Sequence, residues 1–372
     1  MTNHVGKLNI YLKQARVNAE GADAMAIVIG NEAADLDSMV SAILYGLFAS
    51  ACRPPGAPPV VPVVNCPRGD FALRTEAVYL FAALGVDVDA LLFIDEIDLE
   101  ALHRAGRLRL TLVDHNILSA DQEKYADAVD GIIDHHADGG LYPQAGPRTI
   151  EPVGSAATLV AEAVLRERPA LIDTVSAMLL LGTILLDTVN LDPAAGRVTS
   201  KDRDIAARLG MVADRDTDDL FATLQSEKFN LSALGTGDLL RKDYKSWETP
   251  SGRYGMSTVL ISIGEWIAKD PGLVSGLESF LQSRGLACLM AMMAYTGSNG
   301  GFRRELVVYA PDPAPVADLL TMLEASDLEL ERIRPAGLAD PDRIMMFTQG
   351  NASVSRKKLQ PLLHRFFSRS PG

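Results

Sequence analysis

The sequence has few cysteine and aromatic residues, and these shortages exclude several classes of protein. Its 3 Cys are odd in number and show no CxxC spacing, which argues against a disulfide framework or a structural zinc site and favours a reducing compartment. Aromatic residues make up only 6% of the chain, so a platform for stacking nucleic-acid bases is not expected. The N-terminal segment contains no long apolar run, so we expect no signal peptide and no membrane span.

Positive charge is also in deficit, because the formal net charge is -13. A chain this acidic repels nucleic-acid phosphates, and an anionic substrate would need bound cations or a local basic cluster to offset the overall field. We therefore expect no nucleic-acid partner, no membrane partner and a monomer or weak oligomer. A cytoplasmic location is predicted, with an organelle such as an acidocalcisome or mitochondrion as the alternative.

Apolar runs alternate with helical patterns in the first part of the chain. Residues 25–29, 60–64, 91–94, 108–113 and 131–133 are short apolar runs typical of buried parallel strands. Segments 8–18, 38–48, 75–84, 156–166 and 172–186 show the pattern of helices. This alternation predicts an α/β fold, with an N-terminal doubly wound, mostly parallel sheet.

The pattern changes in the second part of the chain. Strands are predicted at 254–263, 287–295, 303–309 and 344–348, and helices at 271–284, 314–325 and 355–367, which indicates a smaller mixed α+β domain. The polar stretch 190–203 contains Pro and Gly and is the best candidate for the connection, with one more helix before the break. We therefore predict domains at 1–212 and 213–372.

Acidic and histidine side chains follow several of the predicted strands. Asp35 and Asp37 follow the first strand, the pair Asp114-His115 follows another, the run 134–136 (Asp-His-His) follows a third, and Asp187 ends an apolar helix. A single Asp in such a place is usually a helix cap or a turn residue. Parallel strands bring their carboxyl ends to one edge, where several carboxylates would repel each other unless cations neutralise them. Oxygen ligands combined with imidazole suit divalent Mn, Co or Mg.

These motifs resemble those of the DHH phosphoesterase superfamily. The resemblance rests on Gly-Asn-Glu-Ala-Ala-Asp-Leu-Asp-Ser at 30–38, Val-Asp-His-Asn at 113–116, Ile-Asp-His-His at 133–136 and the later Asp187. Segments 64–76, 93–98 and 154–159 resemble stretches of eukaryotic-type exopolyphosphatases and prune-type proteins. The resemblance implies a catalytic DHH domain, a C-terminal DHHA2 domain that binds substrate, and an active site in the cleft between the two.

The resemblance also implies a role for individual residues around two divalent ions. Asp35 would bind one ion and Asp37 the other, Asp114 would bridge them, and His135 and Asp187 would complete the second site. The candidate catalytic residues are Asp114, His136 and Asn31, with His136 facing substrate. Related pyrophosphatases have a metal-binding His where this chain has Asn31, and the weaker amide ligand would favour use of Mg.

Basic residues are the candidates for binding substrate phosphates. Surface charge runs are usually only solvated, but Arg pairs with two phosphate oxygens and Lys acts as a compact charge. In the second domain, Lys245, Arg356 and Lys357 match basic motifs implied by the resemblance. The substrate-binding set predicted in the first domain is His115, His136, Arg68 and Arg74.

The expected activity is that of an exopolyphosphatase, which hydrolyses terminal phosphoanhydride bonds of inorganic polyphosphate and other short phosphoanhydrides and releases orthophosphate. One alternative is an inorganic pyrophosphatase, but Asn31 and segment 65–76 argue against it. A nucleotide phosphodiesterase or nucleoside polyphosphate hydrolase is another. A prune-like scaffold without catalysis is the third, and the intact Asp and His motifs argue against it.

Overall fold

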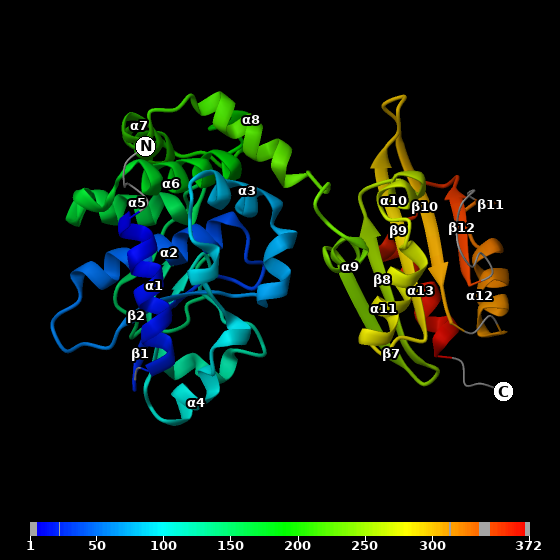
Figure 1. Ribbon diagram of the computed structural model, residues 1–372, viewed down its shortest axis with the longest axis horizontal. Helices are drawn as coiled ribbons and strands as arrows, with labels where there is room; N and C mark the ends of the chain where they lie inside the picture. The colour runs from blue at the N-terminus through cyan, green and yellow to red at the C-terminus, as the bar shows by residue number, and fades with distance from the viewer. Residues whose placement is uncertain (1–5, 22, 312–313, 335–342, 369–372) are drawn as a thin grey trace. The chain divides into compact units, whose positions relative to one another are not determined.

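The computed structural model describes residues 6–21, 23–311, 314–334 and 343–368, which belong to two compact units (Figure 1). The first unit is Met1–Asn230 and the second is Leu231–Gly372. Helix α8 (Thr217–Lys228) packs on α3 (Thr75–Ala83) and α6 (Thr174–Asp187). The Thr75 hydroxyl donates to the carbonyl of Glu227 at 2.6 Å. The first unit therefore extends beyond residue 212 and includes the polar stretch 190–203.

The first unit is built on a six-stranded sheet in the order β3-β2-β1-β4-β5-β6, and every neighbouring pair of strands is parallel. The strands are β1 (Met25–Ile29), β2 (Val60–Val64), β3 (Leu92–Phe93), β4 (Leu108–Val113), β5 (Val129–Asp134) and β6 (Arg148–Ile150). The strand order reverses between β1 and β4, and open α/β sheets bind ligands at the carboxyl ends of strands at such a point. The predicted doubly wound parallel sheet is confirmed.

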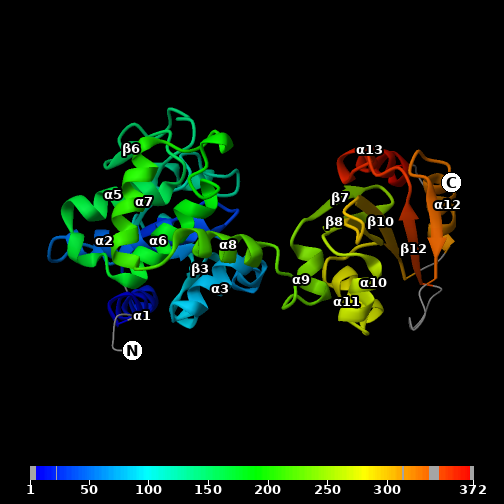
Figure 2. The same cartoon turned by 90° about the horizontal axis from the view of Figure 1, so that it is seen from above.

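Both faces of this sheet are buried, which explains why its strands are continuous apolar runs. One face, with Val28 and Val113, shares a core with α2 (Leu36–Cys52), α5 (Ala156–Glu167), α6 and α7 (Ser200–Ala213). The opposite face, with Ile27 and Leu112, packs against α4 (Leu99–Arg104) and the 3₁₀ turn Glu123–Ala128. Figure 2 shows α2, α5, α6 and α7 close together. Helix α1 (Gly6–Gly21) precedes the first strand in the sequence.

The second unit has a six-stranded mixed sheet in the order β11-β12-β10-β9-β8-β7. Its strands are β7 (Tyr244–Thr249), β8 (Gly252–Val259), β9 (Cys288–Thr296), β10 (Phe302–Tyr309), β11 (Leu330–Ile333) and β12 (Ile344–Gln349). Its helices are α9 (Thr236–Arg241), α10 (Ile263–Lys269), α11 (Leu273–Ser283), α12 (Ala314–Glu324) and α13 (Arg356–Phe367). Strands β8 and β9 are parallel and the other pairs antiparallel, so the predicted mixed α+β fold is confirmed.

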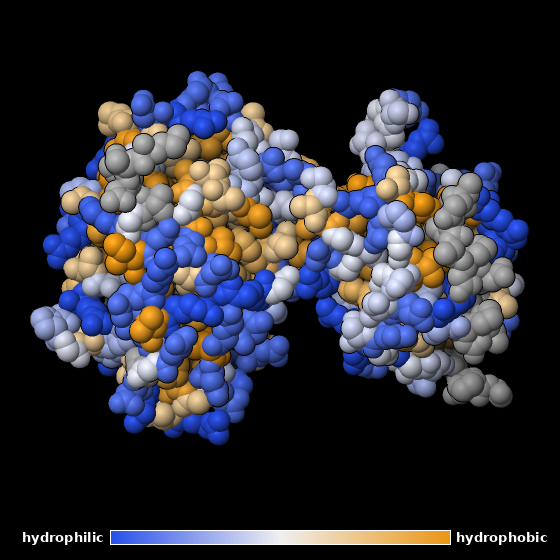
Figure 3. Space-filling view, viewed as in Figure 1, coloured by the Kyte–Doolittle hydropathy of each residue, from blue (hydrophilic) through white to orange (hydrophobic). Residues whose placement is uncertain are grey.

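On the face that Figure 3 displays, hydrophobic residues gather near the middle of the first unit among hydrophilic ones, and the second unit is mostly hydrophilic. Some exposed apolar residues, for example Ile10 and Val17 on α1, are normal on a folded protein. Within the described residues, none of the helices combines the length and the apolar character needed to cross a membrane.

Candidate active site

A cavity of about 470 Å³ lies at the carboxyl ends of β1, β4 and β5, the edge at which the strand order reverses. All five residues predicted as metal ligands line it. The described lining residues are Asn31, Asp35, Asp37, Asp114, His135, His136, Pro152, Val153, Gly154, Asp187, Gly196 and Arg197. Every one of them belongs to the first unit, so this cavity is formed within that unit alone.

The N-termini of two helices hold the first pair of aspartates. Asp35 caps α2, because its carboxylate accepts a hydrogen bond from the backbone N–H of Ser38 at 3.1 Å. Asp37 is only 3% exposed, and its carboxylate accepts the backbone N–H groups of Ala156 at 2.7 Å and Ala157 at 2.8 Å. Both N–H groups belong to the first turn of α5, where the helix dipole favours negative charge. The local fold therefore fixes both carboxylates.

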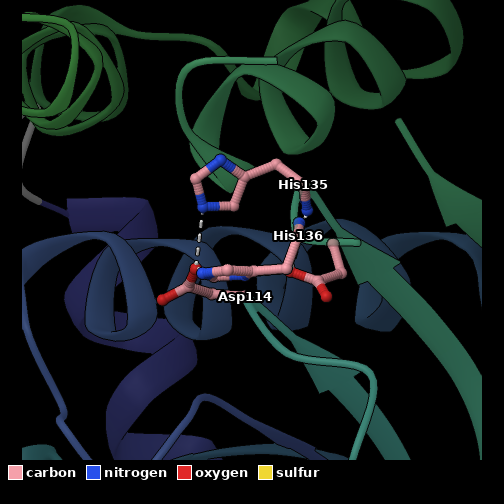
Figure 4. Close-up of side chains that lie close together, drawn as sticks. Asp114, His135 and His136 are labelled. Carbon is pink, nitrogen blue, oxygen red and sulfur yellow. Dashed lines mark hydrogen bonds and ion pairs between the residues drawn. The ribbon is translucent and has the colours of Figure 1, made fainter. Parts of the chain in front are cut away.

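Asp114 lines the cavity and has a left-handed backbone, with φ of 60°. Its carboxylate accepts the Ser38 hydroxyl at 2.6 Å and the Asn31 amide at 2.8 Å. The same carboxylate lies 3.2 Å from Nε2 of His135 (Figure 4). A non-glycine residue in this conformation is uncommon and persists where the surrounding structure enforces it, as at functional sites.

The side-chain amide of Asn31 is hydrogen-bonded to Asp114 and holds it in place. Its amide nitrogen donates to the carboxylate of Asp114 and, at 3.1 Å, to the carbonyl of the same residue. Its amide oxygen accepts the backbone N–H of Ala33 at 2.9 Å. The side chain therefore joins the loop after β1 to the end of β4, and the predicted catalytic role of Asn31 stays a prediction.

The two histidines after β5 are held in different ways. Nδ1 of His135 lies 3.0 Å from the carbonyl of Val153, which leaves Nε2 directed at Asp114 (Figure 4). Nδ1 of His136 lies 2.8 Å from the carboxylate of Asp134, a fully buried residue that also accepts the Asn116 amide at 2.5 Å. Asp134 therefore positions His136, a role that its place in the Asp-His-His run could have suggested.

The cavity concentrates negative charge that its own residues do not balance. Burial and the charge of Asp114 raise the pKa of Asp35, and burial together with Asp114 and Asp187 raises the pKa of Asp37 well above its usual range. Burial and the charge of Asp35 raise the pKa of Asp187 to about 7. One carboxylate oxygen of Asp187 is buried without a hydrogen-bond partner in the described structure.

His135 supplies part of the missing positive charge. Burial of its imidazole lowers the pKa, but the hydrogen bond with Asp114 and the charge of Asp37 prevail and raise the pKa to about 9. Several carboxylates short of cations, an unpartnered oxygen on Asp187 and a directed imidazole nitrogen together fit divalent ions such as Mn, Co or Mg. The ligand atoms of Asp114, Asp134, His135 and His136 lie within 4.8 Å of one another.

Comparisons with known proteins agree with this arrangement. The family model described as DHH family, N-terminal domain, matches residues 25–183, and the DHHA2 domain matches residues 222–366. Proteins named exopolyphosphatase PRUNE1 from Bos taurus and Homo sapiens are each 34% identical to this chain, over 96% of it and 79% of their own length. The chain belongs to the DHH family. A manganese-dependent inorganic pyrophosphatase from Methanocaldococcus jannaschii is 26% identical over 70% of this chain and 80% of its own length.

Arg68, predicted to bind substrate in the DHH domain, is committed to structural partners and does not line the cavity. Its guanidinium donates two hydrogen bonds to the carboxylate of Glu96, at 2.5 and 2.9 Å, and one to the carbonyl of Leu91 at 2.6 Å. It also lies 4.4 Å above the ring of Phe93. These contacts join the family segments 64–76 and 93–98, so Arg68 stabilises the fold, and its contact with substrate stays a prediction.

Arg74 and His115 also lie outside the residues that line the cavity. The Arg74 guanidinium donates to the carbonyls of Ala33 at 2.8 Å and Ala34 at 3.2 Å, which braces the loop just before Asp35. Nδ1 of His115 lies 2.9 Å from the carbonyl of Val113, and burial lowers the pKa of its imidazole. The predicted roles of Arg74 and His115 in binding phosphate stay predictions.

The DHHA2 unit brings its predicted basic residues together at one end of its sheet. The guanidinium of Arg356, at the start of α13, donates to the carboxylate of Asp243 at 2.6 Å. Asp243 directly precedes β7, which carries Lys245, and Lys357 follows Arg356 on the helix. Lys245 and Lys357 are exposed. Asp243 therefore holds the guanidinium of Arg356. The basic cluster is defined here as Lys245, Arg356 and Lys357, and its predicted contact with substrate stays a prediction.

Proposed function

We propose that this protein is an exopolyphosphatase that uses two divalent cations to hydrolyse the terminal phosphoanhydride bond of inorganic polyphosphate, releasing orthophosphate. The observation that carries the proposal is the meeting of Asp35, Asp37, Asp114, His135 and Asp187 around one cavity. The names of the PRUNE1 relatives support polyphosphate as the substrate, and the name of the pyrophosphatase relative supports manganese as one usable ion.

In the proposed enzyme, Asp35 and Asp37 bind one ion each, Asp114 binds both, and His135 and Asp187 complete the second set. Bound divalent ions would lower the pKa of a water and neutralise charge on the phosphoryl group. Ser38, Asn31 and the N-terminus of α5 keep the acidic side chains in place, so little rearrangement is needed. His136, anchored by Asp134, either stabilises the developing anion or donates a proton to the leaving oxygen.

The proposal is tested by measuring phosphate release from medium-chain polyphosphate, pyrophosphate, a cyclic nucleotide and a nucleoside tetraphosphate, each with Mg, Mn and Co. We expect release from polyphosphate with at least one of these metals and none after chelation. Cleavage of pyrophosphate alone would replace the proposal with a pyrophosphatase. Cleavage confined to the nucleotide substrates would indicate the nucleotide hydrolase, and no cleavage with any metal would indicate a scaffold.

Substitution Arg356→Ala is expected to raise the KM for polyphosphate by about tenfold to a hundredfold, because a charge-assisted contact with phosphate is lost. Metal affinity should not change, since Arg356 belongs to the second unit and the candidate metal ligands belong to the first. Steady-state kinetics and calorimetric metal titration measure the two effects. Lys358→Ala, the next-but-one residue and also exposed, is the control. Equal KM values for both variants would contradict a role for Arg356.

A further inference from the structure

Arg197 is a basic side chain of the first unit that lines the same cavity as the acidic residues. It lies between α6 and α7, in the polar stretch 190–203 that sequence patterns suggest as a connection. Of the described residues that line the cavity, it is the one with a permanently charged cationic side chain. We propose that Arg197 binds the non-bridging oxygens of the phosphoryl group being cleaved, an inference that rests on the proposed phosphoanhydride substrate.

Asp202 fastens the loop that carries Arg197 to Gly154, another residue that lines the cavity. This carboxylate is fully buried and accepts the backbone N–H of Gly154 at 3.0 and 2.9 Å and the hydroxyl of Thr158 at 2.6 Å. It also accepts the N–H of Thr199 at 2.8 Å, two residues beyond Arg197. A Cβ atom at Gly154 would lie 3.2 Å from the carbonyl oxygen of Arg197 and 2.4 Å from Thr188, so glycine permits this close approach.

The chain reaches this loop through an unusual backbone. Val189, Asn190 and Leu191 follow Asp187 closely, and their φ angles of 51°, 57° and 60° place three consecutive residues in the left-handed region. Left-handed residues other than glycine normally occur singly, because each brings Cβ close to a carbonyl oxygen. The N–H of Asn190 donates to the carbonyl of Leu185 at 2.7 Å, which holds the turn. The fold therefore accepts strain to return the chain from Asp187 to the cavity wall.

The charge balance of the cavity gives the positive charge of Arg197 a role. Asp35, Asp37, Asp114 and Asp187 carry four negative charges, which two divalent ions would neutralise without surplus. A polyphosphate chain adds further negative charge. A site whose metals only neutralise its own carboxylates has no positive charge left to balance that of the substrate. Within the described structure Arg197 forms no ion pair with a carboxylate, so its guanidinium is available for substrate oxygens. A guanidinium pairs with two phosphate oxygens at once.

The test compares Arg197→Ala and Arg197→Lys with Arg208→Ala, which removes an exposed arginine of α7 that does not line the cavity. Arg197→Ala should weaken binding of imidodiphosphate, a non-hydrolysable phosphoanhydride analogue, by about tenfold to a hundredfold in the presence of Mg. The same variant should raise the KM for polyphosphate by a similar factor. Arg197→Lys should recover part of the loss, because it keeps the charge without the planar fork. Binding of Mn alone should match that of the unchanged protein.

Two results would overturn the inference. The first is Arg197→Ala binding imidodiphosphate as tightly as Arg208→Ala while the unchanged protein hydrolyses polyphosphate. The second is an equal loss of Mn affinity in Arg197→Ala, which would show that the substitution disrupts the metal site instead. A failure of the proposed function looks different, because the unchanged protein would then release no phosphate from polyphosphate. Weaker binding of the analogue in Arg197→Ala would in that case still support a phosphate contact.

Discussion

Substitution Asp114→Ala is expected to lower phosphate release from polyphosphate to less than about one-thousandth of the activity of the unchanged protein, since several interactions of this cavity-lining residue are lost together. The carboxylate of Asp114 is the proposed ligand shared by both ions and lies 3.2 Å from Nε2 of His135. It is 2% exposed and also receives the Ser38 hydroxyl and the Asn31 amide. Removing this carboxylate leaves the two donors without their acceptor. It also removes the ligand that the two proposed ions would share.

Asp114→Asn separates catalysis from folding, because the amide keeps the size of the side chain but cannot carry the bridging charge. We expect it to fold and to be nearly as inactive as the alanine variant. Asp121→Asn, an exposed aspartate of the same unit, serves as the control for loss of one negative charge. Calorimetric titration with Mn should show fewer bound ions or weaker binding in both Asp114 variants. Metal affinity and turnover equal to those of Asp121→Asn would refute the assignment.

The sequence allowed the acidic and histidine residues that line the cavity to be predicted together because each stands at a recognisable boundary. Asp35 and Asp114 follow strands whose apolar runs are buried on both faces, and His135 follows a third. Parallel strands place all these boundaries at one edge, so the residue pattern predicted that the side chains meet, whereas their individual roles as ligands came from the resemblance to the DHH superfamily. Asp187 ends the buried helix α6, which the helical pattern at 172–186 predicted.

Other features depend on contacts between distant residues, which a single sequence does not reveal. Arg68 reads as a phosphate-binding candidate, but its partner Glu96 stands 28 residues further along the chain. The cavity-lining Arg197 carries no motif of its own, since its position depends on Asp202 and Gly154, 48 residues apart. The short strand β6 and the polar β7 were missed because neither has an apolar pattern longer than a few residues.

The metal-free protein is expected to lose stability as the pH rises from about 4 to about 9, and divalent ions should reverse the loss. The pKa of Asp187 is about 7 in the folded state, above the value of 3.8 that an unperturbed Asp has. Between these values the folded state binds the extra proton, so the free energy of unfolding falls as pH rises. The shift corresponds to a loss on the order of 4 kcal/mol for this buried group.

His135 acts in the same direction at higher pH. Its folded pKa of about 9 exceeds the 6.5 of an unperturbed imidazole, so its stabilising charge is complete below 6.5 and is lost as pH rises to 9. Cations that bind the folded state supply the missing charge and displace these protons, so their stabilising effect should grow with pH. Thermal unfolding midpoints measured at pH 5, 7 and 9, with chelator or with Mn, follow both effects.

Asp187→Asn is the matched variant for this experiment, because its amide has the same shape and no proton to lose in this range. Without metal, its midpoint should change less between pH 5 and pH 7 than that of the unchanged protein. With Mn, it should gain less stability, since one proposed ligand carries no charge. Parallel midpoint profiles for the two proteins, with and without Mn, would contradict the assignment. That result would mean that the acidic groups of the cavity are already balanced by the protein itself.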